Sequence, residues 1–168
     1  HGAPPPASFG TLIDRGNVLS LGSFAKILAP GLRLGWIQAS TELMRTLTAS
    51  GVLVSGGNFN HFTSHIVRQL MENGELAPFV ARLRVSYAAR AEAMDQALRQ
   101  HLSGLARWTK PGGGYFFWLE LPAAVDAASL QDAARAAGTG FLAGTACSTS
   151  GGLKNCLRLS FAHYSVPD

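Results

Sequence analysis

A single lysine, Lys26, stands in an otherwise apolar and glycine-rich segment that runs from residue 20 to 36. Ser23 lies three residues before it, and Arg33 lies seven residues after it. A lysine amine can form a Schiff base with a carbonyl group. A guanidinium beside a hydroxyl suits a phosphate, because the arginine fork matches two phosphate oxygens at once. The three residues therefore predict a site for an aldehyde that carries a phosphate, a description that pyridoxal phosphate (PLP) fits.

The bulk composition favours a folded domain and argues against other classes of protein. Of the 168 residues, 47% are hydrophobic and 14% are charged, so burial is easy and disorder is not expected. The net charge of +4 comes from scattered residues with no basic run, so we expect no nucleic-acid binding through this segment. No apolar run approaches the roughly 20 residues that cross a bilayer, and no signal peptide is visible. We therefore expect no membrane partner.

The cysteines and histidines give little reason to expect a metal. Cys147 and Cys156 match no metal or redox spacing, and two reduced thiols are typical of a cytoplasmic protein. His61 and His65 stand four residues apart, as in one zinc motif. No glutamate follows His61 and no third ligand is evident, so a helix face is the favoured interpretation.

The first half of the chain must position Lys26 and its neighbours. We expect a loop over residues 1–17, strands over 18–21 and 34–39, and a helix over about 59–71. The second strand does not alternate cleanly, which predicts burial on both of its faces. The glycine-bounded segment 51–57 interrupts the pattern. Asn60 could cap the following helix or reach toward a substrate, and the sequence leaves both open.

The second half carries the strongest periodic signal of the chain. Apolar residues recur at three- and four-residue steps from Leu76 to Leu102, which predicts a helix long enough to bridge two lobes. A hairpin is expected over 108–121, where the glycines 112–114 form a turn and the aromatic run 115–118 enters the core. A short helix and two further strands are expected over residues 129–137, 139–142 and 157–161.

Arg158 alternates with two leucines in this last strand, so it faces away from the core. It is either an exposed strand arginine or the partner of an anion, since an arginine in a cleft is costly without one.

Three blocks in order carry a family resemblance. They are L-G-S-F-A-K-I-L-A-P-G-L-R-L-G-W (21–36), P-G-G-G-Y-F-F-W-L-E-L-P (111–122) and N-C-L-R-L-S-F (155–161), and the stretch 56–68 also fits. With them the chain resembles the C-terminal half of a fold-type-I PLP-dependent aminotransferase of class I/II. The resemblance is greatest to the branch that holds 2-aminoadipate aminotransferases and MocR-type regulators.

The resemblance implies an α/β fold of the PLP-dependent transferase type. Residues 1–75 would be the end of the large PLP-binding domain and its sheet. Residues 76–104 would be a long interdomain helix, and 105–168 a small α+β domain without its last helix. Both ends of the chain look like cuts inside a larger protein.

The resemblance also implies roles for single residues. Lys26 would form the Schiff base with PLP and move the proton between substrate and cofactor. Ser23 and Arg33 would hold the phosphate, and Arg158 would bind the substrate α-carboxylate. Ala25 departs from the family, because many relatives carry a second serine there. The reaction would be amino transfer between an amino acid and a 2-oxo acid such as 2-oxoglutarate, in amino-acid metabolism, by a cytoplasmic homodimer.

Two alternatives to an active enzyme stay open. The chain could be the effector domain of a MocR-type, PLP-responsive transcription regulator. It could also be a catalytically incompetent truncated fragment that exposes an apolar surface. The family's pyridine-nitrogen aspartate and glycine-rich phosphate loop come from the preceding half, and neither is found in these residues. The identity of the amino-acid substrate cannot be predicted.

Overall fold

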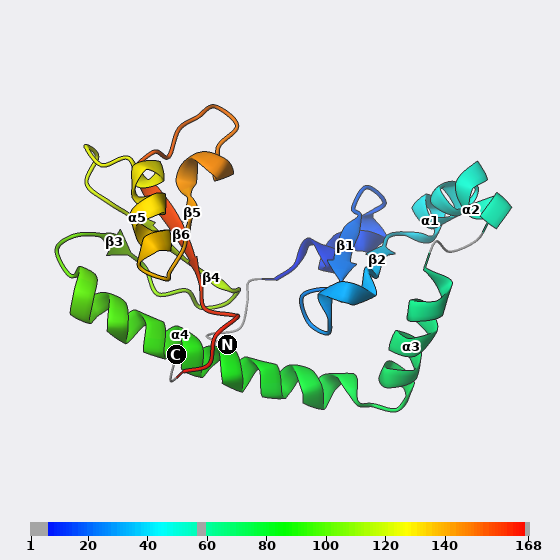
Figure 1. Ribbon diagram of the computed structural model, residues 1–168. Coiled ribbons are helices and arrows are strands. Elements are labelled where there is room, and N and C mark those ends of the chain that lie inside the picture. Colours follow the sequence, from blue (N-terminus) through cyan, green and yellow to red (C-terminus); the bar gives the residue numbers. More distant parts are fainter. Residues whose placement is uncertain (1–6, 57–59, 167–168) are drawn as a thin grey trace. The chain divides into compact units, whose positions relative to one another are not determined.

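The computed structural model describes residues 7–56 and 60–166, and the chain divides into two compact units. The N-terminal unit ends at Leu83, and the C-terminal unit runs from Arg84 onward. The helix α4 (Leu76–Leu102) begins in the first unit and continues in the second (Figure 1). Its 27 residues confirm the long helix that the apolar periodicity predicts.

Before α4 begins, the described part of the N-terminal unit contains a two-stranded antiparallel ribbon, three α-helices and two short 3₁₀-helices (η). In chain order its elements are η1 (Phe9–Arg15), β1 (Ser20–Ser23), η2 (Pro30–Leu32), β2 (Gly35–Gln38), α1 (Thr41–Thr48), α2 (Gly51–Gly56) and α3 (His61–Glu72). The ribbon is in register from Ser20 opposite Gln38 to Ser23 opposite Gly35. The connection from β1 to β2, which carries Lys26, therefore starts and ends at the same end of the ribbon.

A close approach between Gly22 and Trp36 fixes the ribbon. The two residues are opposite each other in the register, and a Cβ on Gly22 would come within 2.0 Å of the Trp36 ring. The indole therefore lies across the glycine backbone, and only glycine leaves room for it. This contact anchors the strand next to Ser23.

The expected burial of the second strand on both faces is wrong. All four residues of β2 are exposed, and Trp36 keeps 40% and Ile37 keeps 47% of its surface in contact with solvent. Leu21, the partner of Ile37, is 74% exposed. The physical reason is that the ribbon has two strands only, and no element among the described residues buries either of its faces completely.

Two segments expected to be irregular are helical. The loop predicted over 1–17 contains η1. Ser8 caps its N-terminus, where the Ser8 hydroxyl accepts a hydrogen bond from the Gly10 N–H at 3.0 Å. The segment 51–57, expected as an interruption, contains α2, whose first turn closes on the Ser50 carbonyl. The glycines of α2 stand at its ends, where they disturb a helix least.

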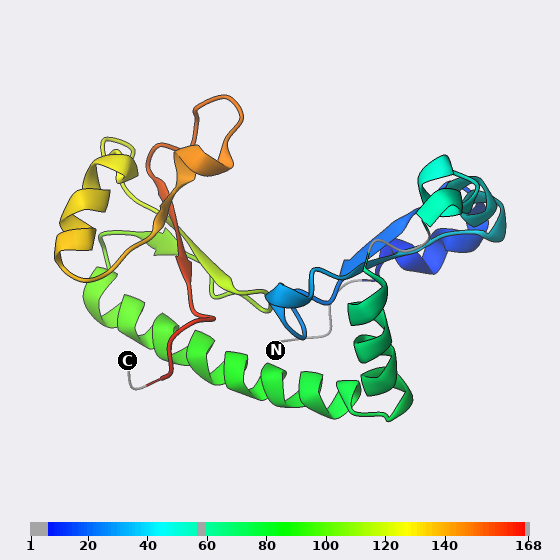
Figure 2. The ribbon, with the colours of Figure 1, turned by 45° about the vertical axis from the view of Figure 1, so that its right-hand side comes forward.

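The C-terminal unit is a four-stranded antiparallel sheet with α4 along one side (Figures 1 and 2). The strand order is β3-β4-β6-β5, which confirms the predicted hairpin as the pair β3 and β4. The elements after α4 are β3 (Arg107–Trp108), β4 (Phe116–Glu120), η3 (Ala127–Leu130), α5 (Gln131–Ala136), β5 (Leu142–Ala143), η4 (Gly144–Cys147) and β6 (Cys156–Ser160).

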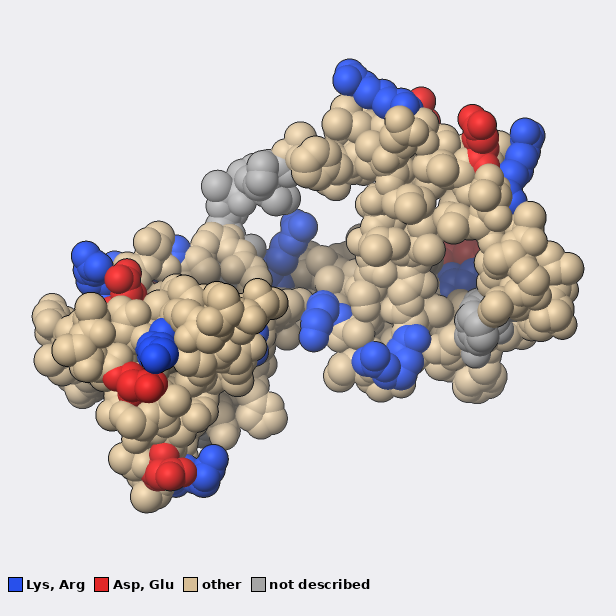
Figure 3. Space-filling view, turned by 90° about the horizontal axis from the view of Figure 1, so that it is seen from above, with Lys and Arg blue, Asp and Glu red and all other residues tan. Residues whose placement is uncertain are grey.

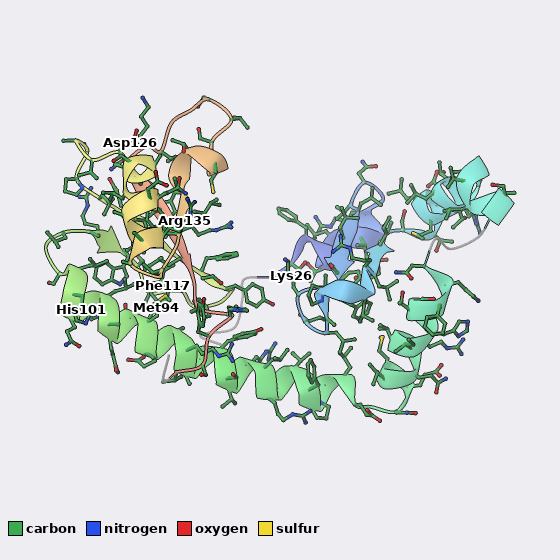
Figure 4. The ribbon with its side chains drawn as sticks, in the orientation of Figure 1. Lys26, Met94, His101, Phe117, Asp126 and Arg135 are labelled. Carbon is green, nitrogen blue, oxygen red and sulfur yellow. The ribbon has the colours of Figure 1, made fainter. Side chains whose placement is uncertain are left out.

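One hydrophobic core holds this unit together. Phe117 and Leu119 of β4 are fully buried, and Leu98 of α4 and Leu157 of β6 join the same cluster. Met94 of α4 packs against it, and Figure 4 shows this side chain close to Phe117. Burying a large apolar side chain stabilises a fold by about 1.5–3 kcal/mol. This core therefore fixes the sheet on α4.

A buried carboxylate links α4 to β3 through a hydrogen bond. Asp95 is 5% exposed, and its two oxygens accept hydrogen bonds from the Trp108 indole N–H at 2.8 Å and the Arg99 Nε at 2.9 Å. The Trp108 hydrogen bond, with help from Arg99, outweighs burial and lowers the pKa of Asp95. Asp95 therefore stays ionised and satisfied inside the unit.

Candidate functional site

The loop that carries Lys26 is anchored by its neighbour Phe24. Phe24 is buried, its N–H donates to the Leu34 carbonyl at 3.0 Å, and its carbonyl accepts from the Leu28 N–H at 2.8 Å. Lys26 follows two residues later and is exposed (Figure 4). A buried aromatic ring and an exposed amine therefore lie two residues apart, directly after β1.

Ser23, the last residue of β1, is exposed and keeps hydrogen-bonding capacity for a ligand. Its hydroxyl oxygen accepts from the Ala25 N–H at 3.2 Å, which forms a local turn at the start of the loop. A serine hydroxyl can still donate its own proton while its oxygen accepts. The Ala25 backbone therefore helps to hold the Ser23 hydroxyl in place.

Arg33 stands at the other end of the loop in an unusual backbone conformation. Its φ of 48° and ψ of 37° lie in the left-handed region, and its Nη1 donates to the Pro30 carbonyl at 3.4 Å. The Asn60 amide donates to the Leu32 carbonyl at 2.7 Å and to the Arg33 carbonyl at 3.1 Å. Asn60 therefore secures the backbone that presents the Arg33 guanidinium.

The role of Asn60 is one that sequence reasoning missed. Asn60 is the N-cap residue of α3, as the first of the two expected roles has it, and its carbonyl accepts from the Ser64 N–H, but its side chain makes no capping hydrogen bond with the helix. Instead, its side-chain amide bonds the carbonyls of Leu32 and Arg33, which lie 28 and 27 positions earlier in the chain. No local sequence pattern could have predicted these two hydrogen bonds.

The chain has three lysines, and their surroundings differ. Lys110 forms an ion pair with Glu92, and Lys154 follows an exposed glycine-rich loop. Lys26 alone stands between a hydroxyl and a guanidinium on one short connection. This donor set fits PLP, since an amine suits its aldehyde, and a hydroxyl and a guanidinium suit its phosphate.

Arg158 lies on β6 in the C-terminal unit, between β4 and β5. Its cross-strand partners are Trp118 and Leu142, and its guanidinium carbon lies 4.0 Å from the centre of the Phe116 ring. It is half-buried and, among the described residues, forms no ion pair with a carboxylate. As predicted, Leu157 on the same strand points into the core instead.

The expectation that the aromatic run 115–118 enters the core holds for one strand face only. Phe117 is fully buried, whereas Phe116 and Trp118 are 42% and 37% exposed. Side chains alternate along a strand, so the two rings lie on the face that carries Arg158. Tyr115 packs edge-on against Tyr87 of α4, with ring centres 5.3 Å apart.

The N-terminal unit also contains an open, mainly apolar groove of about 420 Å³. It lies between the ribbon and α3 and is lined by residues that include Phe24, Trp36, Val67 and Met71. None of the predicted site residues lines it.

His61 and His65 bring their Nε2 atoms to 3.2 Å, but no group of three or more potential ligands occurs among the described residues. On the face in Figure 3 the basic residues are scattered among acidic ones. None of the helices that the structure describes is long and apolar enough to span a membrane.

Comparison with known proteins relates this arrangement to one family. The chain is 35% identical over 155 residues to aromatic-amino-acid aminotransferase 1 of Thermococcus litoralis, which covers 92% of the chain and 36% of that protein. It is 29% identical over 164 residues to the uncharacterised HTH-type transcriptional regulator YdfD of Bacillus subtilis, covering 98% and 33%. The chain thus spans about a third of the length of these relatives.

A solved structure gives the same result for the fold. The α-aminoadipate aminotransferase of Thermus thermophilus, complexed with N-(5'-phosphopyridoxyl)-L-leucine, matches with a TM-score of 0.81 and 32% identity. The match covers 90% of this chain and 39% of that one, and it confirms the expected α/β fold. The family model for aminotransferase class I and II matches residues 2–167. The chain therefore belongs to the class I and II aminotransferase family.

Proposed function

We propose that this chain is part of a PLP-dependent aminotransferase that moves an amino group between an amino acid and a 2-oxo acid. The observation that carries the proposal is the segment from the end of β1 to the start of β2, where Ser23, Lys26 and Arg33 offer a hydroxyl, an amine and a guanidinium. Membership of the aminotransferase family supports the assignment.

Lys26 has the central role in this proposal. PLP, when bound, supplies the aldehyde and the electron-withdrawing ring that make amino transfer possible. The Lys26 amine would hold the cofactor between turnovers and would move a proton to and from the substrate carbon during them. The buried Phe24, two residues earlier, fixes the backbone from which the Lys26 side chain extends.

Ser23 and Arg33 hold the phosphate of the cofactor. The Ser23 hydroxyl would donate a hydrogen bond to the phosphate, and the Arg33 guanidinium would donate to it as well and balance part of its charge. The register of the ribbon and the two hydrogen bonds from Asn60 set the positions of these donors before the cofactor arrives. Preorganised donors lose less entropy on binding than mobile ones.

Arg158 binds the α-carboxylate that every amino-acid substrate shares. A guanidinium presents two parallel N–H donors to a carboxylate, which a lysine cannot do. The absence of a carboxylate partner for Arg158 among the described residues is consistent with this role. The side chain of the substrate is not specified by these four residues.

The proposal extends to the setting of the enzyme. We place it in the cytoplasm as a homodimer, which acts in amino-acid metabolism and biosynthesis; two free cysteines, Cys147 and Cys156, suit a reducing compartment. We assign residues 1–75 to the large PLP-binding domain, 76–104 to an interdomain helix and 105–168 to the small domain.

The test is amino transfer by the full-length protein with PLP. Aromatic amino acids and 2-aminoadipate serve as donors and 2-oxoglutarate as the acceptor, and the glutamate formed is measured. We expect turnover by the wild type and by Lys154→Ala, and none by Lys26→Ala. Turnover by Lys26→Ala at the wild-type rate would contradict the role of this lysine.

A second candidate function is supported by the 29% identity to the HTH-type regulator over nearly the whole chain. In that case the same fold senses PLP or an amino acid and controls transcription. A helix-turn-helix domain joined to the chain in the full-length protein distinguishes the two. DNA binding that responds to PLP, without glutamate formation, would favour the regulator.

A further inference from the structure

The Phe116 side chain is exposed, because it lies on the face of β4 that points away from the core. It lies on the same face of the sheet as Arg158, diagonally across the pair β4 and β6, because Phe116 is opposite Ser160 and Trp118 is opposite Arg158. Diagonal neighbours on one face of a sheet are within reach of long and aromatic side chains. The ring is 42% exposed, and the guanidinium carbon of Arg158 lies 4.0 Å from its centre.

The surroundings of Arg158 give its guanidinium few other contacts. Trp118 and Leu142 flank it across the two neighbouring strands and offer no negative charge. No described carboxylate pairs with it. A cation over the face of an aromatic ring is attracted by the ring quadrupole. The Phe116 ring is therefore the contact that orients the Arg158 guanidinium, and none of the described residues accepts a hydrogen bond from its N–H donors.

We propose that Phe116 is a positioning residue, which holds the Arg158 guanidinium on its ring face so that it receives a carboxylate with two hydrogen bonds. This inference rests on the proposed role of Arg158 in carboxylate binding. Without the ring, the long arginine side chain has to be ordered by the ligand itself, and the binding free energy falls by the cost of that ordering. Phe116 acts through Arg158 and does not touch the carboxylate.

The experiment is an NMR titration of the full-length ¹⁵N-labelled protein with glutarate, a dicarboxylate that carries neither an amine nor an oxo group. The indole N–H of Trp118, the cross-strand neighbour of Arg158, reports binding in every variant. Phe116→Leu removes the ring and keeps an apolar side chain. Phe116→Tyr keeps the ring, and Phe9→Leu, at a site that is 78% exposed, is the matched control.

We expect Phe116→Leu to weaken glutarate binding roughly 2- to 13-fold, which corresponds to the cost of ordering one long side chain on binding. Phe116→Tyr should restore most of the affinity, and Phe9→Leu should bind as the wild type does. In the Arg158→Ala background, Phe116→Leu should add no further loss, because the ring then has no guanidinium to hold. The Leu157 and Leu159 amide shifts check that the sheet is intact in each variant.

The outcomes separate this inference from the proposed function. Wild-type affinity in Phe116→Leu, or an equal loss with and without Arg158, would overturn the positioning role alone. Glutarate binding that survives Arg158→Ala unchanged, or no binding to the wild type, would overturn the carboxylate role of Arg158 and the inference with it.

Discussion

The two units of the chain are built on different physical principles. The C-terminal unit buries a continuous cluster that joins α4, the sheet and η3, with Phe117, Leu119 and Ala127 fully enclosed. In the N-terminal unit, Phe24 and Val67 are the only buried apolar residues among those described. One unit is therefore stabilised by its own core. The other depends on a few anchors and presents its reactive side chains on an exposed loop.

The difference explains where each kind of site residue is found. Arg158 lies on a central strand, where packing on the opposite face sets the backbone. Lys26 and Arg33 lie on a loop, whose backbone is set instead by the Gly22–Trp36 contact and by the Asn60 hydrogen bonds. Substitutions in the core of the C-terminal unit should therefore lower the free energy of unfolding, whereas substitutions that loosen the loop should have smaller effects, mainly on ligand binding.

The largest expected effect is loss of the core ring in the C-terminal unit. Phe117→Ala should lower the free energy of unfolding by about 3–5 kcal/mol, because it leaves a cavity at a fully buried site. The matched change Phe9→Ala, in the N-terminal unit, should alter it by less than about 0.5 kcal/mol. Urea denaturation followed by tryptophan fluorescence measures both. Equal losses at the two positions would refute the contrast between the units.

A smaller effect is expected from the buried carboxylate of the same unit. Asp95→Ala leaves the Trp108 indole N–H without its acceptor and should cost about 1–3 kcal/mol of unfolding free energy. Arg99→Ala should cost less, because the Arg99 side chain is 66% exposed and Asp95 keeps its hydrogen bond from the Trp108 indole when Arg99 is removed. Urea denaturation at pH 7 provides the comparison, and a cost from Arg99→Ala larger than that from Asp95→Ala would be inconsistent with it.

The stability gap between wild type and Asp95→Ala should depend on pH in one direction. The pKa of Asp95 is lowered in the folded state, mainly by the Trp108 hydrogen bond, so the folded protein binds this proton less readily than the unfolded chain. The stabilisation is fully present above the unfolded pKa of about 3.9. It is lost as the pH falls from there through the folded pKa. A gap that widens on acidification would show that the sign is wrong.

The smallest effect concerns the support of the phosphate donors in the N-terminal unit. Asn60→Ala removes the two hydrogen bonds to the Leu32 and Arg33 carbonyls, and it should weaken PLP binding roughly 2- to 10-fold. Pyridoxal, which lacks the phosphate, should lose little affinity. Ser64→Ala is the control, because its hydroxyl bonds within α3. An equal loss for PLP and pyridoxal would show that Asn60 does not act through the phosphate donors.

Periodic patterns predicted the elements that pack on a core. The apolar steps from Leu76 to Leu102 correspond to α4, and the alternation around Arg158 correctly placed it opposite Leu157. Both predictions succeed because burial of one face leaves a regular trace in the sequence. The family resemblance from the block around Lys26 is likewise confirmed by the family match.

The features that the sequence did not predict depend on contacts between distant residues or on burial that a pattern cannot specify. The exposure of β2 could not be predicted, because the sequence of an apolar strand does not indicate how many strands lie beside it. The hydrogen bonds from Asn60 to the loop of Arg33 join residues far apart in the chain. The Phe116 ring was assigned to the core with its neighbours, and only the register shows that it faces Arg158.

The most direct test of the account is to locate the lysine that holds PLP. The full-length protein is incubated with PLP and reduced with borohydride, and its peptides are mapped by mass spectrometry. Because this chain contains only Lys26, Lys110 and Lys154, each of its lysines can be examined separately. We expect the reduced adduct on the Lys26 peptide, and its loss in Lys26→Ala but not in Lys110→Ala. An adduct on another lysine, with Lys26 unmodified, would contradict the account.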